Sequence, residues 1–273
     1  DAEQSFYDRG KIRDILYISC EGIVQNKKFT AMMQDILKTL ESQYGVPVDI
    51  EYTVNFNEND EFVVNLVQCR PLSVWKTAES VRIPELSKEQ TLFKIRKNFM
   101  GDTASQNIDY VVWIDSEEYY RFPYAKKSQV MSAIDMINTH LSGKDTRLML
   151  VAPGRIGTSS PELGIPVGFS QISNFRVICE YSDGKAGYKP ELSYGSHMFQ
   201  DLVEADIFYI AIYESEDTLE FNRDFWNDSK NIFREICPEY ESLREVIRVY
   251  KTDFLMLYAD IKGQMAVCGL SIP

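Results

Sequence analysis

The chain has 273 residues, of which 44% are hydrophobic and 26% are charged, and its formal net charge is −12. These values are ordinary for a soluble globular protein with one large or two ordinary domains. The negative charge argues against a nucleic-acid backbone or an anionic membrane as the main partner. It does not argue against ATP, because a local cationic pocket or a bound metal ion can override the field of the whole chain.

Five cysteines are scattered through the sequence without any C-x-x-C pair, which fits reduced thiols and is typical neither of a zinc site nor of a disulfide framework. The first residues, "DAEQSFYDRGKIRD", hold no apolar stretch of the signal-peptide type, and no apolar run approaches the length of a membrane span. We therefore expect a cytoplasmic protein. Because the chain does not begin with Met, we also expect an excised or processed piece.

Residues 28–44, "KFTAMMQDILKTLESQY", carry apolar side chains at helical spacing and predict an amphipathic helix. Gly45 is a typical C-terminal stop, and Pro47 prevents continuation of the helix. Two alternating segments follow, "VDIEYTVNF" at 48–56 and "FVVNLVQCRPL" at 62–72, with an acidic turn between them. This pattern predicts a β-hairpin in which Asp49 and Glu51 share one face of the first strand.

Residues 76–90 are polar and include Pro84, which makes them the best candidate for a linker. After it we expect a helix over "KEQTLFKIRKNF" (88–99), a buried strand over "DYVVWID" (109–115), a helix over 124–141 and a strand over "TRLMLVAPG" (146–154). Strands "FRVICEY" (175–181) and "DIFYIAIYE" (206–214) flank a short helix near 196–204. Residues 254–272 predict a closing hairpin turned at Lys262 and Gly263.

The strand, helix and strand between 109 and 154 have the spacing of a βαβ unit, which indicates a sheet that is at least partly parallel. We therefore predict an α/β fold, with α+β as the alternative class. Residues 1–78 would form one domain, and residues 79–273 would form a mixed-sheet α/β domain.

The two hairpin strands carry an unusual set of polar side chains at one end. Residues two apart on a strand point to the same side, so Asp49 and Glu51 form one pair and Gln68 and Arg70 another. Carboxylate and amide oxygens are the ligands that Mg²⁺ accepts, and the planar guanidinium of arginine matches phosphate. This set predicts the metal and polyphosphate end of a nucleotide site. From spacing alone, the plainer interpretation is a solvated face with one cross-strand Glu–Arg pair of small energy.

The stretch "YGVPVDIEYTVN…VVNLVQCRPL" resembles the closing hairpin of the ATP-grasp domain in the family of phosphoenolpyruvate synthase and pyruvate, phosphate dikinase. A small turn, a D-I-E strand, a variable hairpin and a Q-x-R-P end carry the resemblance, which covers roughly residues 28–75. The resemblance implies that Glu51 and Gln68 bind Mg²⁺ together with ATP. It implies that Arg70 is the catalytic residue that contacts the transferred phosphate.

Other features of that family are missing from this sequence. The residues before the hairpin include no Gly-rich loop for the phosphates, and the phosphohistidine segment and the phosphoenolpyruvate-binding barrel are absent. The resemblance therefore implies the C-terminal part of an ATP-dependent phosphotransferase with an acceptor such as pyruvate, inactive by itself. The alternative is a non-catalytic domain that senses a nucleotide or binds a partner. A homodimer that buries the open face of the hairpin is a further expectation.

A Gly- and hydroxyl-rich turn follows the predicted strand at 146–154, in "APGRIGTSSPELGIPVGFSQISNFRVICE". Its backbone N–H groups could face an anion, with Arg155 adding charge. It is neither a Walker A loop nor a G-x-G-x-x-G fingerprint, and an ordinary connecting loop is the plainer interpretation. Further on, "SYGSHMFQDL" places His197 beside Ser196, but no G-x-S-x-G elbow supports a serine hydrolase.

These two stretches resemble a C-terminal extension of phosphoenolpyruvate synthase-like proteins, with "GPGRWGS…LGIPV…QIS…RVI" and later "GTHFFQ" or "GSHFFQ". Ile156 stands here in place of the usual tryptophan. The resemblance covers roughly residues 147–213 and implies no established chemistry. We predict a second polar site from its residues Arg155, Gln171, Arg176, His197 and Gln200, with Arg155 and His197 as cofactor-binding residues.

Overall fold

The chain divides into two compact units, Asp1–Val74 and Trp75–Pro273, which we term the hairpin unit and the sheet unit. The computed structural model describes residues 20–59, 61–72, 80–143, 145–184, 187 and 189–271. Within these ranges, no helix combines the length and the hydrophobicity needed to cross a membrane.

The hairpin unit consists of two helices and two strands: α2 (Glu21–Gln25), α3 (Lys27–Tyr44), β1 (Val48–Phe56) and β2 (Phe62–Pro71). Helix α3 begins where the side chain of Asn26 accepts hydrogen bonds from the backbone N–H groups of Lys28 and Phe29, both at 3.1 Å. It ends at Gly45, whose φ of 72° is the left-handed conformation that glycine adopts without strain. The helix, its stop and the hairpin predicted from the sequence are confirmed.

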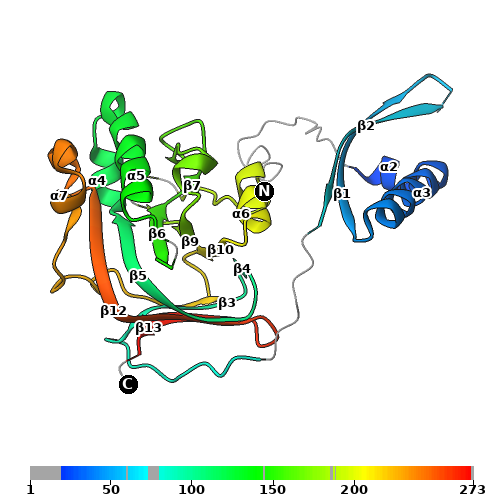
Figure 1. The fold of residues 1–273 in the computed structure, drawn as a ribbon. Helices are drawn as coiled ribbons and strands as arrows, with labels where there is room; N and C mark the ends of the chain where they lie inside the picture. Colours follow the sequence, from blue (N-terminus) through cyan, green and yellow to red (C-terminus); the bar gives the residue numbers. More distant parts are fainter. Residues whose placement is uncertain are drawn as a thin grey trace, which may run out of the picture. The chain divides into compact units, whose positions relative to one another are not determined.

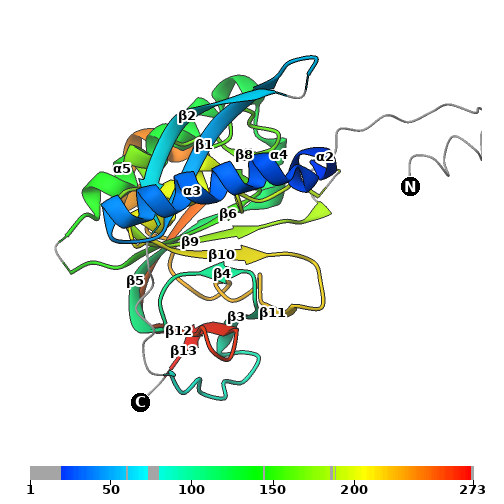
Figure 2. The same ribbon diagram turned by 90° about the vertical axis from the view of Figure 1, so that its right-hand side faces the viewer.

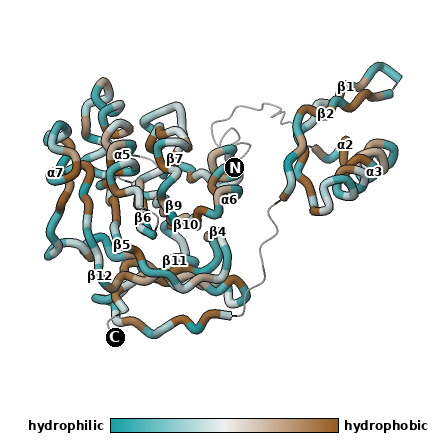
Figure 3. The backbone as a smooth tube through the Cα atoms, viewed as in Figure 1, coloured by the Kyte–Doolittle hydropathy of each residue, from teal (hydrophilic) through white to brown (hydrophobic). Residues whose placement is uncertain are grey.

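Helix α3 lies across one face of the β1–β2 hairpin (Figure 2) and contacts it mainly through one aromatic side chain. Phe29 is 4% exposed, and its ring centroid lies 6.0 Å from that of Tyr52 on β1 and 5.7 Å from that of Phe62 on β2. Figure 3 shows that the tip of the hairpin is hydrophilic. Tyr52 and Phe62 lie on the face of the hairpin that points toward α3.

The sheet unit is built on a nine-stranded sheet with the order β11-β3-β13-β12-β5-β6-β9-β10-β4. Its strands are β3 (Thr91–Arg96), β4 (Phe99–Met100), β5 (Ala104–Ile114), β6 (Leu148–Pro153), β9 (Phe175–Tyr181), β10 (Phe208–Ile212), β11 (Thr218–Phe221), β12 (Ile247–Asp260) and β13 (Met265–Leu270). Strands β7 (Arg155–Ile156) and β8 (Gly164–Ile165) pair separately. The helical elements are α4 (Ser116–Arg121), η1 (Tyr124–Lys126), α5 (Ser128–His140), η2 (Phe169–Gln171), α6 (His197–Glu204), α7 (Phe233–Ile236) and η4 (Pro238–Leu243).

The sheet is mixed. Strands β5, β6, β9 and β10 run parallel to one another, whereas β12, β13, β3 and β11 continue the sheet in antiparallel pairs. The register between β5 and β12 shifts between Lys251 and Leu255, where both strands bend strongly (Figure 1). The predicted α/β class and the parallel βαβ unit of β5, α5 and β6 are confirmed.

Two hydrophobic clusters lie on the two faces of this sheet. Along β5, Val112 and Ile114 belong to the cluster that includes the buried residues of α5, whereas Val111 and Trp113 belong to the other. Successive side chains of a strand point to opposite faces, so a strand that is buried on both sides contributes to both clusters. The parallel strands are thereby fixed in the centre of the unit, and their carboxyl ends carry the polar groups described below.

One expectation was wrong. Residues 88–99, expected as a helix, contain strand β3, followed by Lys97 and Asn98 with positive φ and then by β4. Strand β3 pairs with β13 on one side and with β11 on the other. Hydrogen bonds to strands distant in sequence therefore override the helical propensity of this lysine-rich segment.

Candidate functional site

The register of the hairpin brings the predicted nucleotide-site residues to one end of two paired strands. Asp49 lies directly opposite Arg70, and Glu51 lies directly opposite Gln68. All four side chains are half-buried. The directly opposed positions are thus Asp49 with Arg70 and Glu51 with Gln68.

A β-bulge determines this arrangement. The pairing shifts after Glu51, so Tyr52 lies opposite Leu66 and Val67 is the extra residue on β2. Tyr52 contacts Phe29 of α3, and its neighbour Glu51 therefore points to the opposite face. The polar set lies on the face of the hairpin that α3 does not cover.

The donor set on this face suits a metal ion that is shared with a ligand. Within the described ranges, no group of three or more His, Cys, Asp or Glu side chains could hold a metal ion. The carboxylate of Glu51 and the amide oxygen of Gln68 supply two oxygen ligands from directly opposed positions, whose Cβ atoms are typically about 5 Å apart. Mg²⁺ is usually bound by one or two protein groups together with substrate phosphates and water, so the residues fit Mg²⁺ with a polyphosphate.

The second predicted site begins at the carboxyl end of β6, where the chain turns sharply. Gly154 has a φ of 70°, and its N–H donates to the carbonyl of Tyr181 at 2.9 Å. The guanidinium of Arg155 lies 3.5 Å from the carboxylate of Glu191, and its Nε is buried without a hydrogen-bond partner among the described residues. Arg155 is therefore held in place by its backbone in β7 and only loosely by its side chain.

His197 is the first residue of α6, and its side chain is exposed. The hydroxyl of Ser196 accepts a hydrogen bond from the N–H of Phe199 at 3.3 Å, so Ser196 caps the helix. A Cβ atom built on Gly157 would lie 2.5 Å from Cε of Met198, which shows that the start of α6 packs on the turn after Arg155. The loop of Arg155 and the helix of His197 are thus neighbours.

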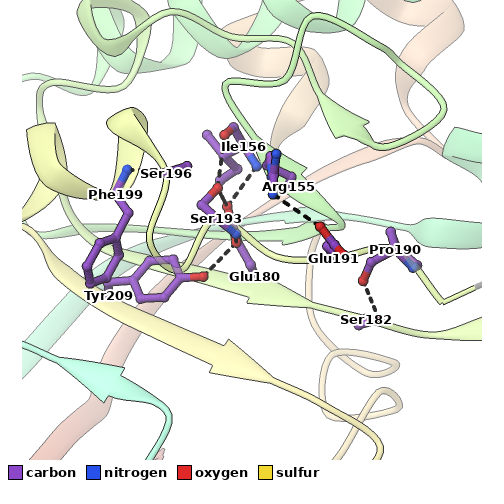
Figure 4. Close-up of polar contacts among 10 residues, drawn as sticks. All are labelled: Arg155, Ile156, Glu180, Ser182, Pro190, Glu191, Ser193, Ser196, Phe199 and Tyr209. Carbon is purple, nitrogen blue, oxygen red and sulfur yellow. Dashed lines mark hydrogen bonds and ion pairs between the residues drawn. The ribbon is translucent and has the colours of Figure 1, made fainter. Parts of the chain in front are cut away.

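The carboxylate of Glu180, on β9, joins these segments (Figure 4). It accepts hydrogen bonds from the N–H of Ile156 at 2.7 Å, the N–H of Ser193 at 2.6 Å and the hydroxyl of Tyr209 at 2.7 Å. The side chain is completely buried. One carboxylate therefore ties β7, the segment before α6 and β10 together at the carboxyl ends of the parallel strands.

The protonation of Glu180 follows from this environment. Burial raises the pKa of Glu180, and the hydrogen bonds from Ser193, Ile156 and Tyr209 offset this rise only in part. The hydroxyl of Ser193 lies 2.5 Å from Oε1 of Glu180 and 3.0 Å from the carbonyl of Ile156. A neutral Glu180 can donate to the Ser193 oxygen while Ser193 donates to that carbonyl, so the protonated form satisfies all these groups.

The remaining predicted residues have different environments. The side chain of Gln171 accepts a hydrogen bond from the N–H of Gly168 at 2.9 Å, within a short turn. Arg176 is exposed at the amino end of β9, whereas Arg155 follows the carboxyl end of β6. Gln200 lies one turn into α6 and is half-buried. The structure thus brings Arg155 and the start of α6 together and places Arg176 at the other end of the sheet.

Comparison with known proteins concerns the hairpin unit. Residues 18–91 match the family model for the AMP/ATP-binding domain of pyruvate phosphate dikinase. The match includes α3 and both strands of the hairpin, and it supports a likeness to that family. It ends at the beginning of β3, so nearly all of the sheet unit lies outside it. No curated protein and no solved structure matches the chain.

Sequence reasoning missed several polar residues at the carboxyl ends of the parallel strands. Glu180 stands in the strand "FRVICEY", whose other charged residue, Arg176, is exposed; an acid among the buried residues of a strand could have marked it. Asp183 follows the same strand, is 2% exposed and accepts a hydrogen bond from Arg223. Nothing in the local sequence pairs Asp183 with Arg223, which lies 40 residues further along the chain.

Proposed function

We propose that the hairpin unit holds Mg²⁺ and the terminal phosphates of ATP, as part of an ATP-dependent phosphotransferase related to pyruvate phosphate dikinase. In this proposal Glu51 and Gln68 bind the metal ion, and Arg70 is the catalytic residue that contacts the transferred phosphate. The observation that carries it is the hairpin register, which gathers these side chains on one face within the residues that match the family model.

The three residues have complementary roles. Glu51 and Gln68 face each other, so their oxygens can reach a single cation. Arg70 follows Gln68 by two residues and shares its face, which places it about 7 Å further along the strand, within the span of a polyphosphate chain. Asp49 lies opposite Arg70 and would orient its guanidinium. Bound Mg²⁺ would neutralise phosphate charge, which is the main contribution that a protein makes to phosphoryl transfer.

The exposed apolar surface of the hairpin unit supports a role within a larger nucleotide-binding assembly. Val24, Val63 and Val67 are more than 60% exposed, and Tyr52, Phe56 and Leu66 are exposed as well. Several large exposed apolar side chains within one small unit are typical of surface that packs against other protein. In this proposal the hairpin holds the phosphate end of the nucleotide site. Pyruvate, or a similar small acid, is the acceptor of the phosphate.

The test is a calorimetric titration of the whole chain with a non-hydrolysable ATP analogue in the presence of Mg²⁺. We expect Glu51→Ala and Arg70→Ala each to weaken binding by at least about tenfold, which corresponds to 1.4 kcal/mol. Glu58→Ala, at the tip of the same hairpin, and Lys38→Ala, on α3, remove charges of the same signs elsewhere in the unit and should leave binding unchanged.

Two outcomes would contradict the proposal. One is the absence of measurable binding by the unaltered chain. The other is equal affinity in the unaltered chain and in both the Glu51 and the Arg70 variants. Loss of binding in the Glu58 and Lys38 variants as well would show a general effect of charge on the hairpin unit. The assignment of nucleotide binding to Glu51 and Arg70 would then be wrong.

A further inference from the structure

The sheet unit contains a cavity of about 570 Å³ at the carboxyl ends of β9 and β10, where Tyr181 and Ile212 pair. Ligands of α/β proteins bind preferentially outside the carboxyl ends of parallel strands, and this volume is in the range of small-molecule sites. None of the residues predicted from the sequence lines it. We term it the Arg223 cavity, after one of its lining residues; its lining also includes Tyr181, Glu216, Thr218 and Phe221.

The guanidinium of Arg223 is fixed in this cavity by a buried acid. The carboxylate of Asp183, which is 2% exposed, accepts a hydrogen bond from Nη1 of Arg223 at 2.7 Å and a second one from the hydroxyl of Ser116 at 2.7 Å. Arg223 makes no other hydrogen bond among the described residues. A guanidinium has five N–H donors in a rigid plane, so most of them are available to a ligand in the cavity.

Two aromatic rings, of Tyr181 and Phe221, pack against the guanidinium of Arg223. The guanidinium carbon lies 5.6 Å from the ring centroids of both Tyr181 and Phe221. The rings of Tyr181 and Phe221 lie 5.4 Å apart and both stack on the buried Trp113 at 5.8 Å. This rigid aromatic group orients Arg223 and offers an apolar wall to the body of a ligand.

The hydroxyl of Thr218 supplies an independent indication of a ligand. Thr218 lines the cavity, and its Oγ1 is buried without a hydrogen-bond partner among the described residues. A buried polar group without a partner is costly, and such groups are uncommon in folded proteins. A ligand oxygen that accepts from this hydroxyl would remove the cost.

The charges of the lining residues decide between anions. The carboxylate of Asp183 offsets the positive charge of Arg223. The exposed Glu214 is paired with Lys189 at 2.6 Å. Glu216, which also lines the cavity, has no ion pair among the described residues. A dianionic phosphate would therefore meet more repulsion here than a carboxylate with a single charge.

We propose that the Arg223 cavity binds a small aromatic carboxylate. The carboxylate accepts hydrogen bonds from Arg223 and Thr218, and the aromatic body lies against the half-buried Phe221. All residues of this site belong to the sheet unit, so the proposal does not rest on the proposed nucleotide site.

The test is a titration of the whole chain with 3-phenylpropionate, in which binding is measured by ligand-observed NMR and by calorimetry. We expect binding of the unaltered chain, weaker binding of phenyl phosphate and none of the neutral 3-phenylpropanol. Thr218→Val should weaken the binding of 3-phenylpropionate about fivefold, the effect of one hydrogen bond. Arg223→Lys keeps the charge but loses the planar fork, so it should weaken binding at least about tenfold.

Thr218→Val is the decisive variant because it removes a hydroxyl that has no partner in the protein, so the melting temperature should not fall. Arg234→Lys is the matched control, since Arg234 is paired with Glu241 and does not line the cavity. The absence of binding by the unaltered chain would overturn the proposal. Unchanged affinity in both the Thr218 and the Arg223 variants would overturn it too, as would tighter binding of phenyl phosphate.

Discussion

Glu51 lies directly opposite Gln68 across the β1–β2 hairpin, on the face that points away from α3. This relationship depends on the bulge at Val67, which shifts the pairing of the two strands by one residue between the polar end and the rest of the hairpin. Tyr52 and Phe62 therefore face α3, while the polar residues of the other end share the opposite face.

Gln68→Glu should make nucleotide binding strongly dependent on the metal ion. The substitution places a second carboxylate opposite Glu51, where like charges repel each other and a bound cation neutralises both. We expect the affinity for the ATP analogue to fall about tenfold without Mg²⁺ and to recover when Mg²⁺ is added, as measured by calorimetry in the two conditions. Asn65→Glu, beyond the bulge, is the control. Equal loss with and without Mg²⁺ would count against a metal site at Gln68.

Phe29→Ala should unfold the hairpin unit and leave the sheet unit intact. Phe29 is the buried residue through which α3 contacts both strands, and truncation of a buried phenylalanine costs roughly 3 to 5 kcal/mol. Calorimetric unfolding should show the loss of one transition while the transition of the sheet unit keeps its midpoint. Met32→Ala removes a side chain that is 42% exposed and should change little. A single transition that moves as a whole would contradict the independence of the units.

The parts of the fold that were predictable are those specified by local sequence. Helix α3 ends at Gly45 because glycine adopts the left-handed conformation there, and strand β9 has the bounds expected from its apolar run. Strand β3 was not predictable in this way, because its apolar residues Leu92, Phe93 and Ile95 fit both the spacing of a helix and that of a strand. Its partners β11 and β13 lie more than 100 residues further along the chain.

The candidate sites were predictable to the same limited extent. Alternation along β1 places Asp49 and Glu51 on one face, but only the bulge decides that Glu51 faces Gln68. Asp183 and Arg223 are brought together by the parallel pairing of β9 with β10 and by the return of β11. Contacts of this kind depend on the topology of the whole sheet, which no local pattern encodes.

Gly164→Ala should destabilise the loop of Arg155 and with it the sheet unit. Gly164 has a φ of 153°, and a Cβ atom there would lie within 2.3 Å of the backbone N and O of Arg155. The β7–β8 pair cannot form without moving that backbone, so we expect a loss of more than about 3 kcal/mol in the free energy of unfolding, measured with urea. Gly184→Ala is the control, because an added Cβ meets nothing within 4 Å. Equal stability of the two variants would contradict this packing.

Glu180→Gln should destabilise the sheet unit most at low pH. Because the pKa of Glu180 is raised in the folded chain, the folded state binds its proton more tightly than the unfolded state does. The stabilisation from this proton is complete below the unfolded pKa, about 4.5, and is lost as the pH rises through the folded pKa. Glutamine cannot titrate, and its amide cannot replace both acceptor oxygens that Ile156, Ser193 and Tyr209 use.

The measurement is the difference in the free energy of unfolding between the unaltered chain and Glu180→Gln across pH 4 to 8, an interval chosen to include the unfolded pKa. We expect the variant to be less stable by roughly 1 to 3 kcal/mol at the acidic end, because buried donors lose an acceptor, and we expect this difference to shrink as the pH rises. Glu241→Gln, at an exposed position, controls for the loss of a carboxylate as such. A difference that grows with pH would show that the network instead stabilises the ionised form of Glu180, and that Ser193 donates to the carboxylate rather than to the carbonyl of Ile156.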